Sequence, residues 1–163
     1  MANAELRLLV DFQLAENVEN PVESSDSLLD IAQTAFNVGA LQLKAKLSTD
    51  EEYECVIRLV QEKESEQLNS EYRSKNKPTN VLSFTYDDLE TYLGDIVICL
   101  PVVEREAQEQ NKSFLHHLQH MIVHGILHLL GYDHEQNGEA EQMEALEQII
   151  LAKFGIDNPY QPH

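Results

Sequence analysis

The sequence predicts one α+β domain, in which a small mixed sheet of four strands is covered by helices. Two observations lead to this prediction. Strand-like segments fall within the first hundred residues, and helical segments lie between and after them, with no repeat or linker dividing the chain. With 163 residues, the chain also has the usual length of a single domain that buries its own core.

The first predicted strand is residues 5–14, where apolar side chains alternate with mostly polar ones. Its apolar side consists of Leu6, Leu8, Val10, Phe12 and Leu14. Three more strands are predicted at residues 54–60, 80–84 and 94–100. The last of these is apolar enough to be buried on both faces of a sheet.

The predicted helices are residues 24–41, 62–73, 101–110, 113–131 and 139–155. The first begins at a Ser/Asp cap, and its end stays open, because Gly39 can stop it while the residues that follow can continue it. Pro101 suits the first turn of its helix. The last two helices end at Gly131 and Gly155, the usual left-handed stop. The domain is therefore predicted to span residues 1–155, with residues 156–163 as a frayed tail.

Composition favours a globular protein of the cytoplasm. The N-terminal residues lack the basic and apolar regions of a secretory signal, and the longest apolar runs are far too short to span a membrane. Cys55 and Cys99 lie in apolar runs without metal-binding spacing, so we expect buried, reduced thiols.

The charge distribution bears on nucleic-acid binding. A net charge of −18 argues against such a partner, since phosphate contacts need cations. Residues 44–77, however, hold seven of the eleven Lys and Arg residues against eight acids. Within them, the stretch YRSKNK (72–77) has three cations and no acid. Two interpretations stay open, a confined basic patch and a solvated loop with scattered lysines.

Three histidines have the spacing of a metal site. His124 and His128 lie four apart on a predicted helix, so their imidazoles can hold one ion. A third ligand from further along that helix would not converge with them, but Gly131 can turn the chain back and bring His134 to the ion. Three protein ligands leave a fourth zinc position for water, as in catalytic sites. We expect a packing or second-shell role for His120 and surface positions for His116 and His117.

The run HGILHLLGYDH (124–134) is similar to the HExxHxxGxxH signature of zinc proteases, with Gly125 in place of the catalytic glutamate. A peptidase or amidohydrolase would need another base, for which Asp133 and Glu135 are candidates. Phosphodiester cleavage depends less on a carboxylate and gains more from a cation at the phosphate oxygens, a task that suits the planar guanidinium of Arg73.

Together with NSEYRSKNKPTNVLSF (69–84) and LGDIVIC (93–99), this run resembles the YbeY-type bacterial rRNA-maturation endoribonucleases. The resemblance implies a mixed α/β domain with a zinc-protease-like metal helix. It also implies a zinc-dependent endoribonuclease that acts on single strands, trims the 3′ end of small-subunit rRNA and takes part in ribosome quality control. The implied metal ligands are His124, His128 and His134, holding one Zn²⁺ per chain, and Arg73 is the implied functional arginine.

The residues suggest roles within this resemblance. His124 and Arg73 are the candidate catalytic residues, with zinc-bound water as nucleophile or base. Arg73 would bind the scissile phosphate, and Lys75 and Lys77 the neighbouring ones. Two interpretations stay open for Asn80 and Ser83, strand capping and packing on the one hand and contact with the substrate on the other.

Several alternatives stay open. Nickel or iron(II) would fit the same imidazoles. The expected partners are rRNA and the ribosome, with a small-subunit ribosomal protein or an assembly GTPase as a candidate guide, and neither DNA nor a membrane. The competing functions are a zinc peptidase or amidohydrolase, and a ribosome-assembly factor that binds RNA without cutting it.

Overall fold

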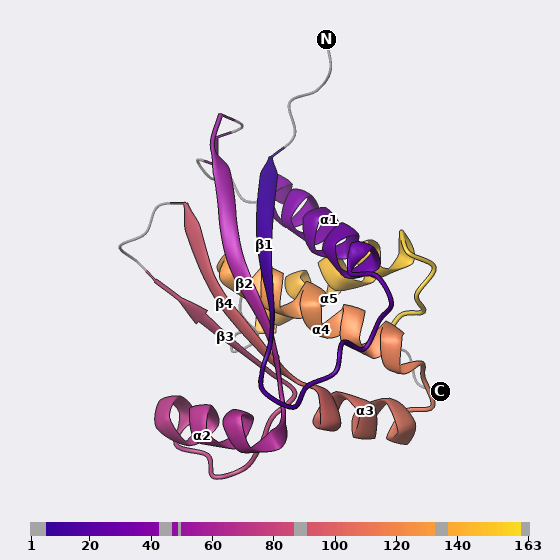
Figure 1. Ribbon diagram of the computed structural model, residues 1–163. Helices are drawn as coiled ribbons and strands as arrows, with labels where there is room; N and C mark the ends of the chain where they lie inside the picture. Colours follow the sequence, from indigo (N-terminus) through magenta and orange to yellow (C-terminus); the bar gives the residue numbers. More distant parts are fainter. Residues whose placement is uncertain (1–5, 43–46, 49, 87–90, 133–136, 161–163) are drawn as a thin grey trace.

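The computed structural model describes residues 6–42, 47–48, 50–86, 91–132 and 137–160 (Figure 1). Its elements follow the order β1 (Arg7–Leu14), α1 (Asp26–Gln42), β2 (Glu52–Val60), α2 (Glu62–Arg73), β3 (Val81–Thr85), β4 (Tyr92–Cys99), α3 (Leu100–Glu109), α4 (Phe114–Leu129) and α5 (Asn137–Ala152). This is the predicted α+β arrangement.

The four strands form one mixed sheet in the order β1-β2-β4-β3. The pairs β1–β2 and β2–β4 are parallel, whereas β3 runs antiparallel to β4 at the edge of the sheet. Strand β4 is central, and its last four residues are buried, as the sequence predicts. The prediction is wrong for Leu14, which is 43% exposed at the end of the edge strand β1.

Helices α1, α4 and α5 pack together on one face of the sheet and enclose the main apolar core (Figure 1). Ile57 of β2 and Ile96 of β4 are fully buried in this core, beneath Ile122 and Ile126 of α4. Because side chains alternate across a sheet, the neighbouring Val97 belongs to a second, smaller cluster on the opposite face. Cys55 and Cys99 are buried free thiols, one in each cluster.

Only part of that opposite face is covered. Leu68 of α2 packs against the second cluster, next to Leu82 and Val97. Figure 1 shows α2 at one end of the sheet, away from the three helices of the main layer. The remainder of this face is therefore left for a cavity, which is described below.

Helix ends follow the local sequence. Helix α1 does not stop at Gly39 but continues to Gln42. Helix α4 ends in the turn that Gly131 allows, since this residue has a φ of +106°. The amide of Tyr132 donates to the carbonyl of Leu127, and the amide of Gly131 donates to that of His128, the two hydrogen bonds of a Schellman motif.

The C-terminal segment differs from the expectation of a frayed tail as far as residue 160. Ile156 is buried against the main core, and the Tyr160 hydroxyl hydrogen-bonds Glu147 of α5. None of the helices in the described part of the chain has both the length and the apolar character needed to cross a membrane.

Candidate active site

The two predicted ligands on α4 lie side by side. Ser113 caps the helix by accepting a hydrogen bond from the amide of His116 at 3.3 Å, so α4 is regular from its first turn. Sixteen residues of regular helix place His124 and His128 on the same side, with their ring centroids 4.6 Å apart. Both side chains are half-buried, so they are accessible while the rest of the helix packs into the core.

A cavity of about 310 Å³ opens over these histidines. Its other wall comes from strand β3 and from the end of α2, and its lining consists of Arg73, Asn80, Val81, Ser83, Thr85, His124 and His128. The structure thus brings together Arg73, His124 and His128, which lie on separate elements in the sequence. Lys75 and Lys77 are exposed on the loop after α2 and are not among the described residues that line the cavity.

Arg73 is held in place by the turn that follows it. It is the last residue of α2, and Ser74 takes up a left-handed conformation, with a φ of 57°, that ends the helix. Two buried polar residues of α2 hold the loop that follows the helix. Asn69 donates to the carbonyl of Lys77 at 2.8 Å, and the hydroxyl of Ser65 forms hydrogen bonds with both the carbonyl and the amide of Thr79.

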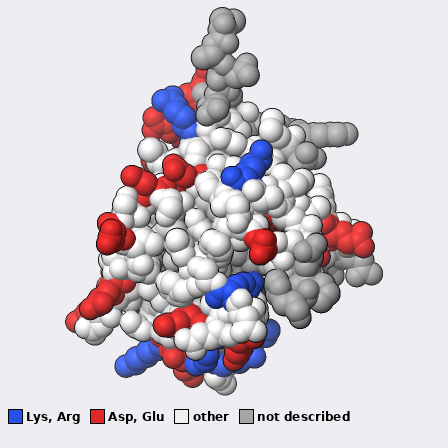
Figure 2. All heavy atoms as spheres, turned by 90° about the vertical axis from the view of Figure 1, so that its right-hand side faces the viewer, with Lys and Arg blue, Asp and Glu red and all other residues white. Residues whose placement is uncertain are grey.

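Arg73 lies in a region of mixed charge without a carboxylate partner among the described residues. None of the ion pairs between described residues involves the guanidinium of Arg73. Figure 2 shows Lys and Arg side chains gathered at the end of the molecule where α2 and α3 lie in Figure 1, interspersed with Asp and Glu. The cations of this region therefore form a mixed surface rather than a purely basic patch.

The third predicted ligand, His134, lies outside the described residues, as do the alternative bases Asp133 and Glu135. Within the part of the chain that the structure describes, no group of three or more His, Cys, Asp or Glu side chains is arranged to hold a metal ion. The described site thus consists of two of the three predicted ligands and Arg73.

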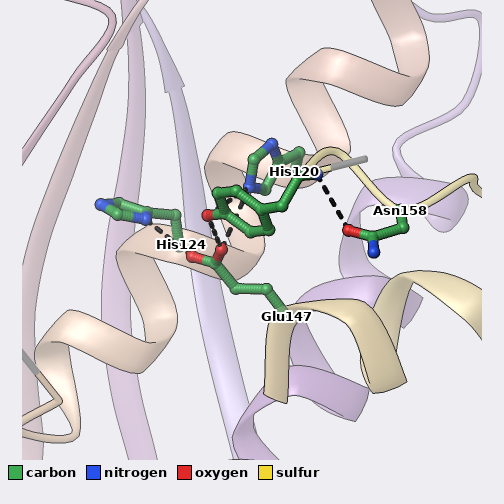
Figure 3. Close-up of polar contacts among 5 residues, drawn as sticks. His120, His124, Glu147 and Asn158 are labelled. Carbon is green, nitrogen blue, oxygen red and sulfur yellow. Dashed lines mark hydrogen bonds and ion pairs between the residues drawn. The ribbon is translucent and has the colours of Figure 1, made fainter. Parts of the chain in front are cut away.

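Glu147 of α5 is a functional candidate that the sequence analysis missed. Its side chain is completely buried, and its carboxylate accepts hydrogen bonds from His124 Nδ1 at 2.7 Å and His120 Nε2 at 3.2 Å. The hydroxyl of Tyr160 donates to the same carboxylate. Figure 3 shows the arrangement, in which the second nitrogen of the His124 ring points away from Glu147. His120 is thus buried beside Glu147, which agrees with the prediction that it is not a surface residue, and its support of a metal ligand stays a prediction.

Glu147 is a buried anion. Burial raises the pKa of its carboxyl group, but the hydrogen bonds from His120 and His124 outweigh burial and lower the pKa to about 2. Burial lowers the pKa of His120, despite the neighbouring carboxylate, so we describe His120 as a neutral imidazole that donates from Nε2. Burial and the charge of Glu147 raise the pKa of Tyr160, which therefore stays a hydroxyl donor.

The donor set fits a divalent cation. A histidine that binds a metal usually donates its other ring N–H to a carboxylate, as His124 does to Glu147, and this bond fixes the tautomer in which Nε2 carries the lone pair that metal coordination requires. Among the ion pairs of the described residues, Glu147 has no Lys or Arg partner. A cation next to His124 and His128 would therefore offset a buried negative charge.

A signal for Glu147 was present in the sequence. It lies four residues after Met143 and three before Ile150, both fully buried, so it occupies the apolar side of an amphipathic helix. An acid at such a position needs a partner in the core. No comparable signal singled out Tyr160, which lies in an irregular C-terminal segment.

The structure also explains Gly125. A Cβ atom at this position would approach Ile96 of β4 to 2.8 Å, because α4 lies directly on the sheet there. Position 125 therefore faces the core, and a glutamate side chain in this place would meet β4 rather than the histidine cavity. The absence of a protease-type glutamate thus follows from close packing between helix and sheet.

His117 corrects the prediction that His116 and His117 both lie at the surface. Its ring is buried, and its Nε2 lies 2.9 Å from Glu106 of α3. Asn80 donates to the same carboxylate at 3.0 Å, and its side-chain oxygen accepts from the amide of Val81, in agreement with a capping role. The His117 hydrogen bond is the main reason why the pKa of Glu106 lies below its ordinary value.

The family model described as Endoribonuclease YbeY matches residues 15–155. An Endoribonuclease YbeY of Idiomarina loihiensis is 44% identical over 158 residues, which cover 94% of this chain and 92% of that protein. Proteins of the same name from Alteromonas mediterranea and Colwellia psychrerythraea are 58% identical over 111 residues and 51% identical over 117 residues. These two matches cover 66% and 69% of this chain, and 70% and 76% of the relatives.

A similar fold occurs in the solution structure of TM1509 from Thermotoga maritima. The match has a TM-score of 0.56 at 24% sequence identity and covers 94% of this chain and all of the other. At this level of identity, the match supports the fold alone.

Proposed function

Because the chain belongs to the YbeY endoribonuclease family, we propose that it is a metal-dependent endoribonuclease that cleaves single-stranded RNA. Its place would be in rRNA processing, at the 3′ end of the small-subunit rRNA, and in ribosome quality control. The observation that carries the proposal is the shared cavity of Arg73, His124 and His128. A guanidinium that lines the same cavity as two imidazoles suits a phosphodiester held beside a cation.

One Zn²⁺ per chain is the proposed cofactor, held by His124, His128 and His134. Imidazole nitrogens are ordinary zinc ligands, and the carboxylate of Glu147 supplies the partner that such ligands usually have. When bound, the cation would supply an activated water and charge stabilisation at the phosphate. Nickel and iron(II) are the alternatives that the same ligands would accept.

The other side chains of the site would bind phosphates or position the metal ligand His124. Arg73 binds the scissile phosphate through its planar fork, and it can do so because no carboxylate among the described residues pairs with it. Lys75 and Lys77 contact phosphates further along the strand. Glu147 holds the His124 ring in one tautomer by accepting its Nδ1 proton. His120 and Tyr160 hold that carboxylate in turn.

RNA cleavage is favoured over peptide hydrolysis by the position of Gly125. A peptidase of the corresponding signature uses a glutamate there, and this position packs against Ile96. The proposed substrate places the protein in the cytoplasm, with rRNA and the ribosome as partners. A small-subunit ribosomal protein or an assembly GTPase would help so acidic a chain to approach RNA.

The test combines metal content with RNA cleavage. His124→Ala should lose both bound zinc and cleavage of a single-stranded rRNA fragment, whereas Arg73→Glu should retain zinc and lose cleavage. Both proteins and the wild type are assayed with and without chelator, on RNA and on peptides. Cleavage by metal-loaded His124→Ala at the wild-type rate would contradict the proposal, as would peptide hydrolysis in place of RNA cleavage.

A further inference from the structure

A second cavity, of about 760 Å³, adjoins the histidine cavity. Arg73, Ser83 and Thr85 line both, so the two cavities meet at the edge strand β3. The second cavity lies on the sheet face against which α2 packs, where that helix leaves part of the sheet uncovered. We call it the aromatic groove, because its lining contains four aromatic side chains, Tyr72, Phe84, Tyr86 and Tyr92.

The aromatic rings of this groove form two pairs. Tyr72, at the end of α2, is 63% exposed and meets the ring of Phe84 edge-on at a centroid distance of 5.0 Å. Tyr86 is 45% exposed and stacks on Tyr92, with centroids 5.8 Å apart and ring planes within 10° of parallel. Each pair thus combines a half-buried ring with an exposed one, which leaves aromatic surface open to a ligand.

The polar groups of the groove are largely satisfied within it. Arg58 forms two hydrogen bonds to the carboxylate of Glu64, at 2.6 and 3.0 Å. Asp95 accepts hydrogen bonds from the hydroxyls of Tyr86 and Tyr92. The bonds to Asp95 hold the rings of Tyr86 and Tyr92 in place, so this part of the aromatic surface is fixed before a ligand arrives.

The groove also differs in charge from the rest of the chain. Its described lining contains two cations, Arg58 and Arg73, and two carboxylates, Glu64 and Asp95, so they balance. In a protein of net charge −18, a neutral groove that ends at Arg73 is a favourable place for an anionic polymer to approach. Since Glu64 already engages Arg58, Arg73 is the cation left for a phosphate.

Flat apolar rings next to a phosphate-binding cation match the chemistry of a single-stranded nucleotide chain. Every nucleobase has a face that stacks on an aromatic side chain, and such stacking needs no particular base sequence. In double-stranded RNA the bases are stacked on one another, so they would not be available to these rings. The groove would therefore discriminate between unpaired and paired RNA.

We propose that Tyr72 and Tyr86 form a subsite that stacks unpaired nucleobases flanking the phosphate held by Arg73. Phe84 and Tyr92 support these rings from the strands beneath. The inference rests on the proposed function, because it takes RNA as the substrate and the histidine cavity as the place of cleavage. It adds a physical basis for the choice of single strands.

Binding of a cleavage-resistant ligand tests the subsite apart from catalysis. The ligand is a fluorescent 2′-O-methyl oligonucleotide, compared with a sugar–phosphate strand of the same length without bases. Tyr72→Ala should weaken binding of the base-bearing strand by roughly 5- to 140-fold, the equivalent of one stacked base, and leave the abasic strand nearly unaffected. Tyr72→Phe should bind like the wild type, and Tyr86→Ala should repeat the loss.

Controls separate the possible outcomes. Ile149 on α5 is similarly exposed, at 51%, so Ile149→Ala should bind both strands like the wild type. Equal weakening of both strands by Tyr72→Ala, unchanged binding of both, or equal wild-type affinity for duplex and single strands would overturn the subsite. Binding of an extended apolar peptide without base-dependent RNA affinity would overturn it as well. Continued RNA cleavage in any of these cases would leave the proposed function intact.

Discussion

Glu147 shows how one buried side chain can define a site. A carboxylate without exposure is stable in the core only when donors surround it, and here His120, His124 and Tyr160 all direct protons at it. In the proposed metal site, its charge and its hydrogen bond to His124 would prepare that imidazole to receive a cation. We therefore propose that Glu147 positions a metal ligand.

The first prediction concerns this residue. Glu147→Gln keeps the shape of the side chain but removes the charge and turns one acceptor oxygen into a donor, which conflicts with the donors around it. Zinc affinity should fall by about 10- to 100-fold. Competition with a chromophoric chelator measures the change.

A control on the same helix is Glu141→Gln, since Glu141 is exposed. This variant should bind zinc like the wild type. Unchanged zinc affinity in Glu147→Gln would show that the carboxylate does not support the metal ligands.

The sequence predicts part of the site at the level of residues, but not how residues from different elements come together. The spacing of His124 and His128 on a helix predicts their proximity, because the helical period fixes it. The approach of Arg73 to them depends on how α2 and α4 pack against the sheet, and no local pattern contains that information. His134 lies outside the described residues, so its place in the ligand set stays a prediction.

At the level of elements, the close contact between α4 and the sheet decides what chemistry the helix can present. The side of α4 that carries Gly125 lies on Ile96, and another side of the helix carries the two histidines. Glycine lets the helix approach β4 and brings the imidazoles close to strand β3. The same approach removes position 125 from the cavity.

The second prediction tests this contact. Gly125→Ala adds a methyl group 2.8 Å from Ile96, and such overpacking destabilises a core by about 1–3 kcal/mol. The higher helix propensity of alanine stabilises the helix by about 1 kcal/mol, which at most offsets that cost. The free energy of unfolding should therefore stay unchanged or fall by up to about 2 kcal/mol. Urea denaturation of the metal-free protein measures it.

Gly138 of α5 provides the matched control, because a Cβ atom there meets nothing within 4 Å. Gly138→Ala should raise the free energy of unfolding by up to about 1 kcal/mol. A similar rise in Gly125→Ala would contradict the role assigned to close packing.

The third prediction concerns the contact between α3, α4 and the start of β3. Glu106 joins His117 and Asn80, and the bond to His117 lowers its pKa below the ordinary 4.5. A lowered carboxyl pKa contributes stability that is fully present above pH 4.5 and is lost as the pH falls through the folded value. Glu106→Gln should therefore be less stable than the wild type at neutral pH, by about 1 kcal/mol.

Denaturation curves of the wild type and Glu106→Gln, recorded from neutral to acidic pH, test whether the stabilisation by Glu106 decreases in acid. The difference in the free energy of unfolding should narrow once the pH falls below 4.5. A difference that stays constant or widens in acid would show that the Glu106 carboxylate is not stabilised by its partners.

The order and type of all described elements agree with the sequence, since each has a clear period or terminal signal. Helix α2 has the predicted bounds of residues 62–73. Tertiary packing decides what local signals leave open, as at the end of α1, where Gly39 lies inside the helix with Leu130 next to it. It also overrides a local signal at His117, which the sequence predicts at the surface, because its partner Glu106 comes from another helix.

On the scale of the whole molecule, the net negative charge of the protein opposes its binding to RNA, which is also negatively charged. With a net charge of −18, the protein as a whole repels a phosphate backbone. The aromatic groove and Arg73 offer a route by which apolar stacking supplies affinity while few cations contact phosphate. Binding should then depend weakly on salt.

The fourth prediction puts a number on that dependence. For single-stranded RNA, each phosphate that a cation neutralises contributes about −0.7 to the slope of log affinity against log salt concentration. Contacts from Arg73, Lys75 and Lys77 should therefore give a slope of about −2. Lys75→Ala and Lys77→Ala should each reduce its magnitude by about 0.7. Lys153→Ala, on the segment after α5, should leave it unchanged. Slopes that do not respond to Lys75 or Lys77 would exclude them from the RNA contact.

We propose above all that imidazoles on α4 hold a divalent cation in the cavity that Arg73 also lines. Diffraction from crystals of the zinc-loaded protein, recorded at the zinc absorption edge, locates the ion. We expect one anomalous peak at about 2.0–2.1 Å from a ring nitrogen of each of His124, His128 and His134, inside that cavity. A peak at another place, or imidazoles of His124 and His128 that turn away from the zinc, would exclude this metal site.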